Sequence, residues 1–122
     1  MPGKNLEFGK LAEEAAVKFL VSKGYKVIGR NYRTRFGEID IIAREDGVTC
    51  FVEVKARHSR LFGEPCEAVS TRKQGQISRC ALYYLKENGL CDKPARFDVV
   101  SVIYADSLPE IELIRDAFAL NS

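Results

Sequence analysis

Residues 37–57 read GEIDIIAREDGVTCFVEVKAR, two apolar runs on either side of an Asp-Gly pair. An Asp-Gly pair between runs rich in β-branched residues is typical of a two-residue type I′ turn, so the stretch predicts a β-hairpin. Three charged residues interrupt the runs, Asp40 in the first and Glu53 and Lys55 in the second. Charged residues at such core-like positions need a physical explanation.

A two-residue turn fixes which residues of the hairpin face one another. The expected pairs are Glu45 with Val48, Ile42 with Phe51, Asp40 with Glu53, and Glu38 with Lys55. Because side chains alternate between the two faces of a strand, we expect the four charged residues of the last two pairs to share one face. The residues of each pair would then have Cβ atoms about 4.5–5.5 Å apart.

Two carboxylates placed opposite each other repel, and the sequence leaves three ways to relieve that repulsion. Asp40 and Glu53 could share a proton, lie beside a cation such as Lys55, or bind a divalent metal. Oxygen ligands of this kind suit Mg²⁺ or Mn²⁺. A purely structural explanation is also open, in which Glu38 and Lys55 form a solvated ion pair and the carboxylate pair is a tolerated clash at an edge.

The rest of the chain predicts a mixed α/β domain. We expect helices over residues 6–23 and 73–88, strands over 25–35 and 95–105, a loop over 58–69, and a less regular element over 110–118. Thr71 and Gln74 fit a capping box for the second helix, and Gly89 fits its end. The order is helix, three strands, helix, one or two strands, with helices packed on a central sheet.

Length and composition restrict the class of protein. A chain of 122 residues fits a single domain, residues 1–122, and the net charge of +2 does not by itself predict a nucleic-acid binder. The first residues lack the apolar segment of a signal peptide, and no apolar run is long enough to span a membrane. We therefore expect a cytoplasmic protein without a membrane partner. The single histidine, His58, excludes a zinc site built from histidines.

The first helix carries a further carboxylate candidate. Leu11, Ala12, Ala15, Ala16 and Phe19 fall on one arc of the helical wheel and predict its buried face. Glu13 lies on the rim of that face and could reach a site at the sheet. We expect Glu14 to pair instead with Lys18 on the solvated side. A local ion pair at Glu13 is the alternative to a role in a site.

Basic residues gather near the expected strand ends and at the start of the second helix. Arg33, Arg35 and Arg57 could line a surface for nucleic acid, although a solvated strand face explains them almost as well. Arg72 and Lys73 oppose the dipole of the second helix, which favours a phosphate docked at its N-terminus with a hydrogen bond from Gln74. An ordinary exposed helix start is the alternative.

At the hairpin the sequence resembles the PD-(D/E)XK nuclease superfamily, in which an Asp precedes a strand carrying Glu-x-Lys. The wider resemblance is to the YraN-like family of predicted endonucleases. It rests on the segments GKLAEEAAVKFLVSKGY, RNYRTRFGEIDIIA, FVEVKAR, GEPCEAV, KQGQISRCALYYL and RFDVV, which span most of residues 9–100. The resemblance implies a restriction-endonuclease-like fold with the order α-β-β-β-α-β.

The resemblance also implies roles for individual residues. Asp40 and Glu53 would bind Mg²⁺ or Mn²⁺, with the Val54 carbonyl oxygen as a third ligand. Lys55 would orient the attacking water or stabilise developing negative charge, and Glu13 would be the helix carboxylate of the site. These roles predict a metal-dependent nuclease that hydrolyses phosphodiester bonds in DNA.

Two other functions stay open. A non-catalytic nucleic-acid-binding module could keep the same fold, and a metal-free hydrolase could use the carboxylate pair as acid and base. The lysine beside the carboxylates makes the second of these the weakest reading. The sequence leaves open DNA or RNA, and duplex, branched or single-stranded substrates. Action on a two-fold junction would favour a homodimer.

Overall fold

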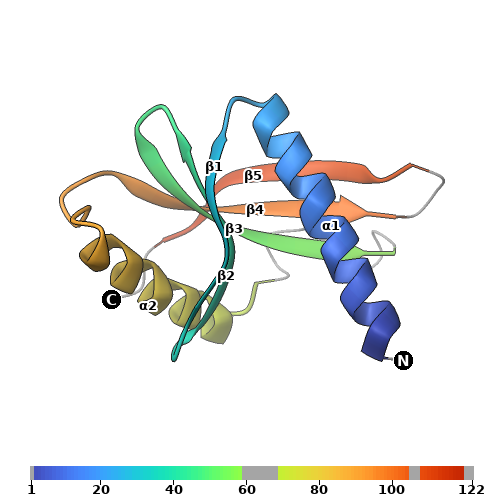
Figure 1. Cartoon of the computed structure of the whole chain (residues 1–122), viewed down its shortest axis with the longest axis horizontal. Helices are drawn as coiled ribbons and strands as arrows, with labels where there is room; N and C mark the ends of the chain where they lie inside the picture. The colour runs from blue at the N-terminus through green and yellow to red at the C-terminus, as the bar shows by residue number, and fades with distance from the viewer. Residues whose placement is uncertain (1, 59–68, 105–107, 120–122) are drawn as a thin grey trace.

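The computed structural model describes residues 2–58, 69–104 and 108–119, with the backbone alone for residues 2–7 (Figure 1). The elements are α1 (Pro2–Ser22), β1 (Lys26–Thr34), β2 (Gly37–Glu45), β3 (Val48–Arg57), α2 (Thr71–Glu87), β4 (Ala95–Ile103) and β5 (Glu110–Phe118). The strands form one sheet in the order β1-β2-β3-β4-β5, parallel between β3 and β4 and antiparallel elsewhere. The expected α/β class with a central mixed sheet is confirmed, and the last expected element is a fifth strand.

The hairpin between β2 and β3 has the predicted turn. Asp46 and Gly47 both have positive φ, 50° and 79°, as a type I′ turn requires. Glu45 pairs with Val48, and the register continues unchanged to Ile41 and Val52. The register expected from the Asp-Gly pair is therefore confirmed over this part of the hairpin.

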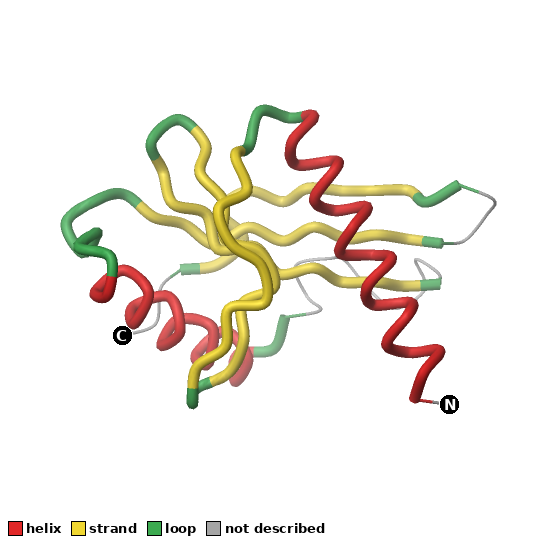
Figure 2. Tube along the Cα trace, viewed as in Figure 1, coloured by secondary structure: helices red, strands yellow, loops and turns green. Residues whose placement is uncertain are grey.

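Two apolar cores lie on opposite faces of the sheet, one under each helix. Figure 2 shows the two helices apart from each other at the sheet. Ala12, Ala16 and Leu20 of α1 are buried against one face, and these small residues let the helix approach the strands closely. The helical-wheel prediction was wrong for Leu11, whose side chain is 62% exposed. The buried stripe follows positions 12, 16 and 20 because the alanines, rather than the larger Leu11, set the contact distance.

The second core lies under α2, whose Ile77, Cys80, Ala81 and Leu85 are buried together with aromatic residues of the central strands. Phe51 and Phe97 lie on neighbouring strands β3 and β4, with ring centroids 5.7 Å apart. This core fixes α2 across the sheet, and the first turn of α2 comes to lie beside Glu53 of β3. The N-terminal end of the helix dipole and the basic residues of that turn therefore lie near Glu53.

The start of α2 differs from the sequence prediction. Ser70, not Thr71, is the N-cap, because its backbone is extended and its Oγ accepts from the Lys73 N–H at 3.2 Å. Gln74 Nε2 donates to the Val69 carbonyl at 2.9 Å, which adds a second side-chain bond at the same end. The helix ends before Gly89, at φ 66°, as predicted.

The expected loop over residues 58–69 lies, apart from its two ends, outside the described residues. The start of α1 at Pro2 comes four residues before the expected start, and a proline suits the first helical position. In the described part of the chain, no helix is long and apolar enough to cross a membrane.

Candidate active site

Strands β2 and β3 separate at the charged residues. Their ladder ends at Ile41 and Val52, so the expected backbone pairs of Asp40 with Glu53 and of Glu38 with Lys55 are not formed. The Val54 N–H instead donates to Asp40 Oδ2 at 2.8 Å. The prediction of opposed pairs was wrong because the ladder between β2 and β3 ends one residue before Asp40 and Glu53 would pair. The carboxylate of Asp40 occupies the place where a β2 carbonyl would have continued the ladder.

This separation also exposes a backbone oxygen. The N–H and C=O of one strand residue point to the same edge of the strand. Since the Val54 N–H points at Asp40, the Val54 carbonyl points to that same edge. The gap between the strands thus brings together a carboxylate and a carbonyl oxygen.

Glu53 lies beside two ammonium groups. Its side chain is only 4% exposed, and its Oε1 lies 2.7 Å from Lys73 Nζ and 3.8 Å from Lys55 Nζ. Lys55 comes from the same face of β3, whereas Lys73 reaches across from the first turn of α2. Lys73, expected on a phosphate-binding helix start, therefore forms the shortest ion pair of Glu53 among the described residues. The two lysines match the charge of Glu53.

The negative charge of Asp40 is only partly compensated by its neighbours. Burial, and then the negative charge of Glu53, raise the pKa of Asp40 to about 7, against the opposing bond from the Val54 N–H. Burial and the neighbouring Lys73 ammonium lower the pKa of Lys55. Burial acts to lower the pKa of Lys73, but its ion pair with Glu53 raises it overall.

Glu13 approaches the same carboxylates from α1. It lines a hollow of about 350 Å³ together with Gly9, Lys10, Asn31, Arg33, Glu38 and Asp40. Burial raises the pKa of Glu13, partly offset by Arg30. With its amide nitrogen turned toward the carboxylates, Asn31 donates to Glu13 Oε1 at 3.3 Å and to Glu38 Oε1 at 3.0 Å. The helix carboxylate, expected at the rim of the buried face, thus lies at the hollow that also holds Asp40.

The ion pairs around this hollow differ from those expected. Glu38 lies opposite Arg33 of β1, with Arg33 Nε 3.6 Å from Glu38 Oε1, and not opposite Lys55. Glu14 pairs with Arg30 of β1 at 2.8 Å rather than with Lys18. Both differences have one cause: β1 passes beside α1 and the start of β2, a proximity that local sequence patterns do not encode.

Two further hollows lie along the end of the β1–β2 hairpin. The first, of about 460 Å³, is lined by residues 33–38. The second, of about 600 Å³, is lined by Tyr32, Arg33, Thr34, Arg35, Tyr83 and Glu87. Arg33 lines all three hollows, and we refer to the three together as the track.

The other predicted nucleic-acid residues lie in different settings. Arg35 is exposed and stacks on Phe36, with 5.0 Å between its guanidinium carbon and the ring centroid. Arg57 ends β3, two residues beyond Lys55 on the same face. Arg72 is exposed in the first turn of α2, while the Gln74 amide is engaged with the Val69 carbonyl. Arg33 and Arg35 line the track, and the Arg57 side chain is half-buried at a strand end.

The donor atoms of the site fit Mg²⁺ or Mn²⁺. Asp40 and Glu53 supply hard carboxylate oxygens, and Val54 adds a carbonyl at the same edge. Among the described residues, no group of three or more His, Cys, Asp or Glu side chains could hold a metal ion. An ion here would complete its shell with the carbonyl, water and substrate phosphate, as Mg²⁺ commonly does. Ser101, beside Lys55 in the ladder, has a buried hydroxyl with no hydrogen-bond partner among the described residues.

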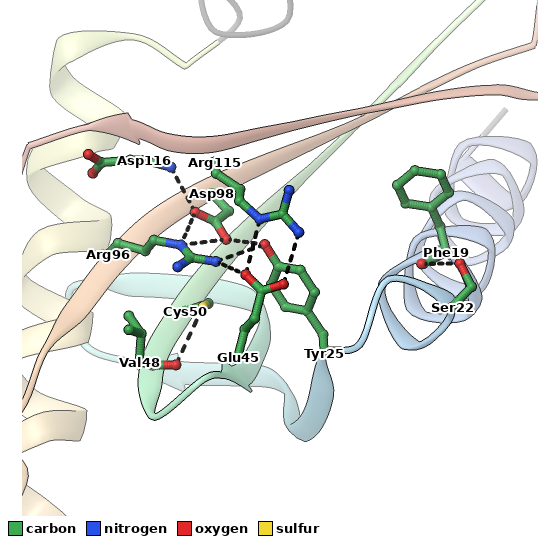
Figure 3. Close-up of polar contacts among 10 residues, drawn as sticks. All are labelled: Phe19, Ser22, Tyr25, Glu45, Val48, Cys50, Arg96, Asp98, Arg115 and Asp116. Atoms are coloured by element: carbon green, nitrogen blue, oxygen red, sulfur yellow. Dashed lines mark hydrogen bonds and ion pairs between the residues drawn. The ribbon is translucent and has the colours of Figure 1, made fainter.

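A second polar cluster, which the sequence analysis missed, surrounds Asp98 of β4, the ladder partner of Val52 (Figure 3). The fully buried Asp98 accepts from Tyr25 Oη at 2.8 Å and from Arg96 Nε at 3.0 Å. Arg96 also donates to Tyr25 Oη and Glu45, and Arg115 binds both oxygens of Glu45 at 3.0 and 2.9 Å. These five side chains join β2, β4 and β5 to Tyr25, the residue before β1.

The charges of this second cluster are fully matched. Hydrogen bonds from Arg115 and Arg96 lower the pKa of Glu45 to about 2, against the effect of burial. The Asp116 N–H supplies a further donor to Asp98 at 2.9 Å. A signal was available in the sequence, since Asp98 interrupts an apolar run as Asp40 does. Its partners, however, are distant along the chain and are brought together only by the fold.

Comparison with known proteins gives consistent matches over most of the chain. The model of "Uncharacterised protein family UPF0102" matches residues 12–102. A UPF0102 protein of Desulfosudis oleivorans is 46% identical over 121 residues, covering 99% of this chain and 97% of its own length. UPF0102 proteins of Syntrophus aciditrophicus and Desulforapulum autotrophicum are 49% and 48% identical, covering 96% and 97% of this chain and 92% and 98% of their own.

Proposed function

The chain belongs to the uncharacterised protein family UPF0102, the YraN-like group, and we propose that it is a metal-dependent nuclease that hydrolyses phosphodiester bonds in DNA. The observation that carries the proposal is the meeting of Asp40 and Glu53 where two core strands separate, with Lys55 on the same face as Glu53. The raised pKa of Asp40, caused by burial and by the charge of Glu53, is typical of acidic groups at functional sites. The restriction-endonuclease-like fold is part of the proposal.

Asp40, Glu53 and the Val54 carbonyl would hold Mg²⁺ or Mn²⁺. When bound, the metal supplies charge neutralisation at the scissile phosphate and lowers the pKa of a bound water. Asp40 must be ionised to bind it, and its raised pKa makes that step dependent on pH near neutrality. Glu13, at the same hollow, would position water or add to the negative potential that attracts the ion.

Lys55 would act on the reacting atoms. Its ammonium lies 3.8 Å from Glu53 Oε1 and can donate to an oxygen bound at the carboxylates. Burial and Lys73 lower its pKa, so it gives up a proton more easily than an exposed lysine. It can therefore help to deprotonate the attacking water or stabilise charge on the phosphate.

The track of hollows would hold the nucleic acid. Arg33 and Arg35 line it and offer guanidinium groups to phosphates, and the exposed Tyr83 ring offers a surface on which a base can stack. The exposed Tyr83 ring beside these arginines suits a substrate with unpaired bases near the cleavage point. We therefore favour branched DNA with single-stranded segments, such as repair or recombination intermediates, over a continuous duplex.

A non-catalytic nucleic-acid-binding module is the second candidate, and one observation favours it. Lys73 and Lys55 already neutralise Glu53, so the fold can keep its carboxylates without a metal. Such a module would bind DNA through the same arginines and cleave nothing.

A cleavage assay separates the two candidates. Labelled duplex, four-way junction and single-stranded DNA, and RNA, are incubated with wild type in Mg²⁺, Mn²⁺ or a chelator. We expect metal-dependent cleavage of at least one DNA, and a loss of about a hundredfold or more in Asp40→Asn and Lys55→Ala. Asp46→Asn, the same change in the exposed turn of the hairpin, should leave cleavage unchanged. DNA binding by wild type without cleavage of any substrate would favour the binding module.

A further inference from the structure

Lys73 occupies an unusual place for a lysine. It lies in the first turn of α2, where the helix dipole disfavours a cation, and the Ser70 cap already binds its backbone N–H. Its ammonium nevertheless reaches the buried Glu53 carboxylate at 2.7 Å. The buried carboxylate is what makes this position favourable, since an unpaired buried charge is strongly destabilising.

Among the described residues, Glu53 has two lysine partners where one would suffice. Lys55 and Lys73 approach the same oxygen, Oε1, and the two ammonium groups repel each other. A divalent ion bound at Glu53 would be repelled by both ammonium groups. Departure of one ammonium and arrival of one phosphate would lower the local positive charge by two.

Lys73 is the ammonium better able to leave. Its side chain is 41% exposed, against 24% for Lys55, and it comes from a helix start rather than from the middle of the sheet. Rotation of its long side chain would carry the ammonium from Glu53 toward solvent. A nucleic-acid phosphate arriving at the same helix start would find that ammonium, the backbone of the first turn and the exposed Arg72.

We propose that Lys73 is a built-in counterion that holds Glu53 until a divalent metal displaces it, and that a nucleic-acid phosphate favours the exchange by binding the released ammonium. The inference rests on the proposed function, because it assigns the metal to Glu53. Its consequence is coupling: nucleic acid raises the affinity for metal, and by linkage metal raises the affinity for nucleic acid by the same factor. The site would assemble fully only on its substrate.

Mn²⁺ titrations, followed by the electron paramagnetic resonance of the free ion, test the displacement. Lys73→Met removes the competing charge, so we expect it to bind Mn²⁺ at least about fivefold more tightly than wild type. Lys86→Met, the same change in the last turn of α2, should bind Mn²⁺ as wild type does. Lys73→Arg keeps a cation on Glu53 and should not bind more tightly. If Lys73→Met destabilises the metal-free protein, its melting temperature should rise more on adding Mn²⁺ than that of wild type.

The coupling is tested by repeating the titrations with four-way junction DNA in a Lys55→Ala background, which we expect not to cleave. DNA should raise Mn²⁺ affinity in Lys55→Ala at least about fivefold, and by less in Lys55→Ala with Lys73→Met. The role of Lys73 would be overturned if folded wild type and Lys73→Met bound Mn²⁺ equally tightly. It would also be overturned if DNA raised the Mn²⁺ affinity equally in Lys55→Ala and in Lys55→Ala with Lys73→Met. Either result would leave the nuclease proposal standing. Absence of Mn²⁺ binding in every variant, with and without DNA, would overturn both.

Discussion

The two acidic clusters of this sheet use opposite electrostatic solutions. In the cluster around Asp98, Glu45 and Asp98 receive donors from two arginines, a tyrosine and a backbone N–H, and the pKa of Glu45 falls to about 2. In the cluster around Asp40, burial and Glu53 raise the pKa of Asp40 to about 7. Arginine forms fixed, bidentate bonds to carboxylates, whereas a lysine ammonium is a mobile point charge. The first cluster joins strands, and in the second the charge of Asp40 is only partly matched.

The largest effect on stability is expected in the cluster around Asp98, whose charges are matched. Arg96→Met leaves the fully buried Asp98 without its guanidinium, and we expect it to lower the free energy of unfolding by about 3–5 kcal/mol. Arg44→Met, at an exposed position of β2, should change it by no more than about 0.5 kcal/mol. Urea denaturation followed by circular dichroism measures both. Similar values for the two variants would show that the cluster contributes no special stability.

A smaller effect, of opposite sign, is expected at the unmatched cluster. The pKa of Asp40 is higher in the folded state than in the unfolded state, so the folded state binds the proton of this carboxyl group more tightly. The protonated group therefore stabilises the fold below about pH 4, and this contribution is lost as the pH rises through about 7. Asp40→Asn keeps an acceptor for the Val54 N–H and removes the repulsion. It should therefore be more stable than wild type by about 1 kcal/mol at pH 8, with the difference shrinking toward pH 4.

Melting temperatures of wild type, Asp40→Asn and Asp46→Asn from pH 4 to pH 8, without metal, measure this difference. The turn variant controls for the loss of a carboxylate elsewhere in the hairpin. An Asp40→Asn protein that is less stable than wild type at pH 8 would show that the Asp40 carboxylate is satisfied by the fold, as Glu45 is.

The sequence predicted the parts of the fold that depend on local chemistry. Asp46-Gly47 sets the hairpin register because a type I′ turn needs two residues with positive φ, and Gly89 ends α2 for a similar reason. The charged residues inside apolar strands also pointed to Asp40 and Glu53 before their surroundings were known. The hairpin brings Asp40 and Glu53 near each other, but the sequence did not predict that the ladder between β2 and β3 ends just before them.

What the sequence could not predict depends on contacts between distant segments. Lys73 reaches Glu53 because α2 crosses the sheet, and nothing near residue 73 encodes that contact. Tyr25 and Asp98 lie 73 residues apart yet share a hydrogen bond. The buried face of α1 follows its alanines because close packing decides it, and a wheel weighted by hydrophobicity placed Leu11 there instead.

Mn²⁺ binding by wild type, Asp40→Asn and Asp46→Asn, measured with and without junction DNA, decides whether the unmatched cluster is a metal site. Wild type should bind Mn²⁺ saturably, more tightly with DNA present. Asp40→Asn should bind at least about tenfold more weakly, a loss of about 1.4 kcal/mol, and Asp46→Asn should equal wild type. Folded wild type that binds no Mn²⁺ under either condition, or an Asp40→Asn protein that binds it equally well, would contradict a metal site at Asp40 and Glu53.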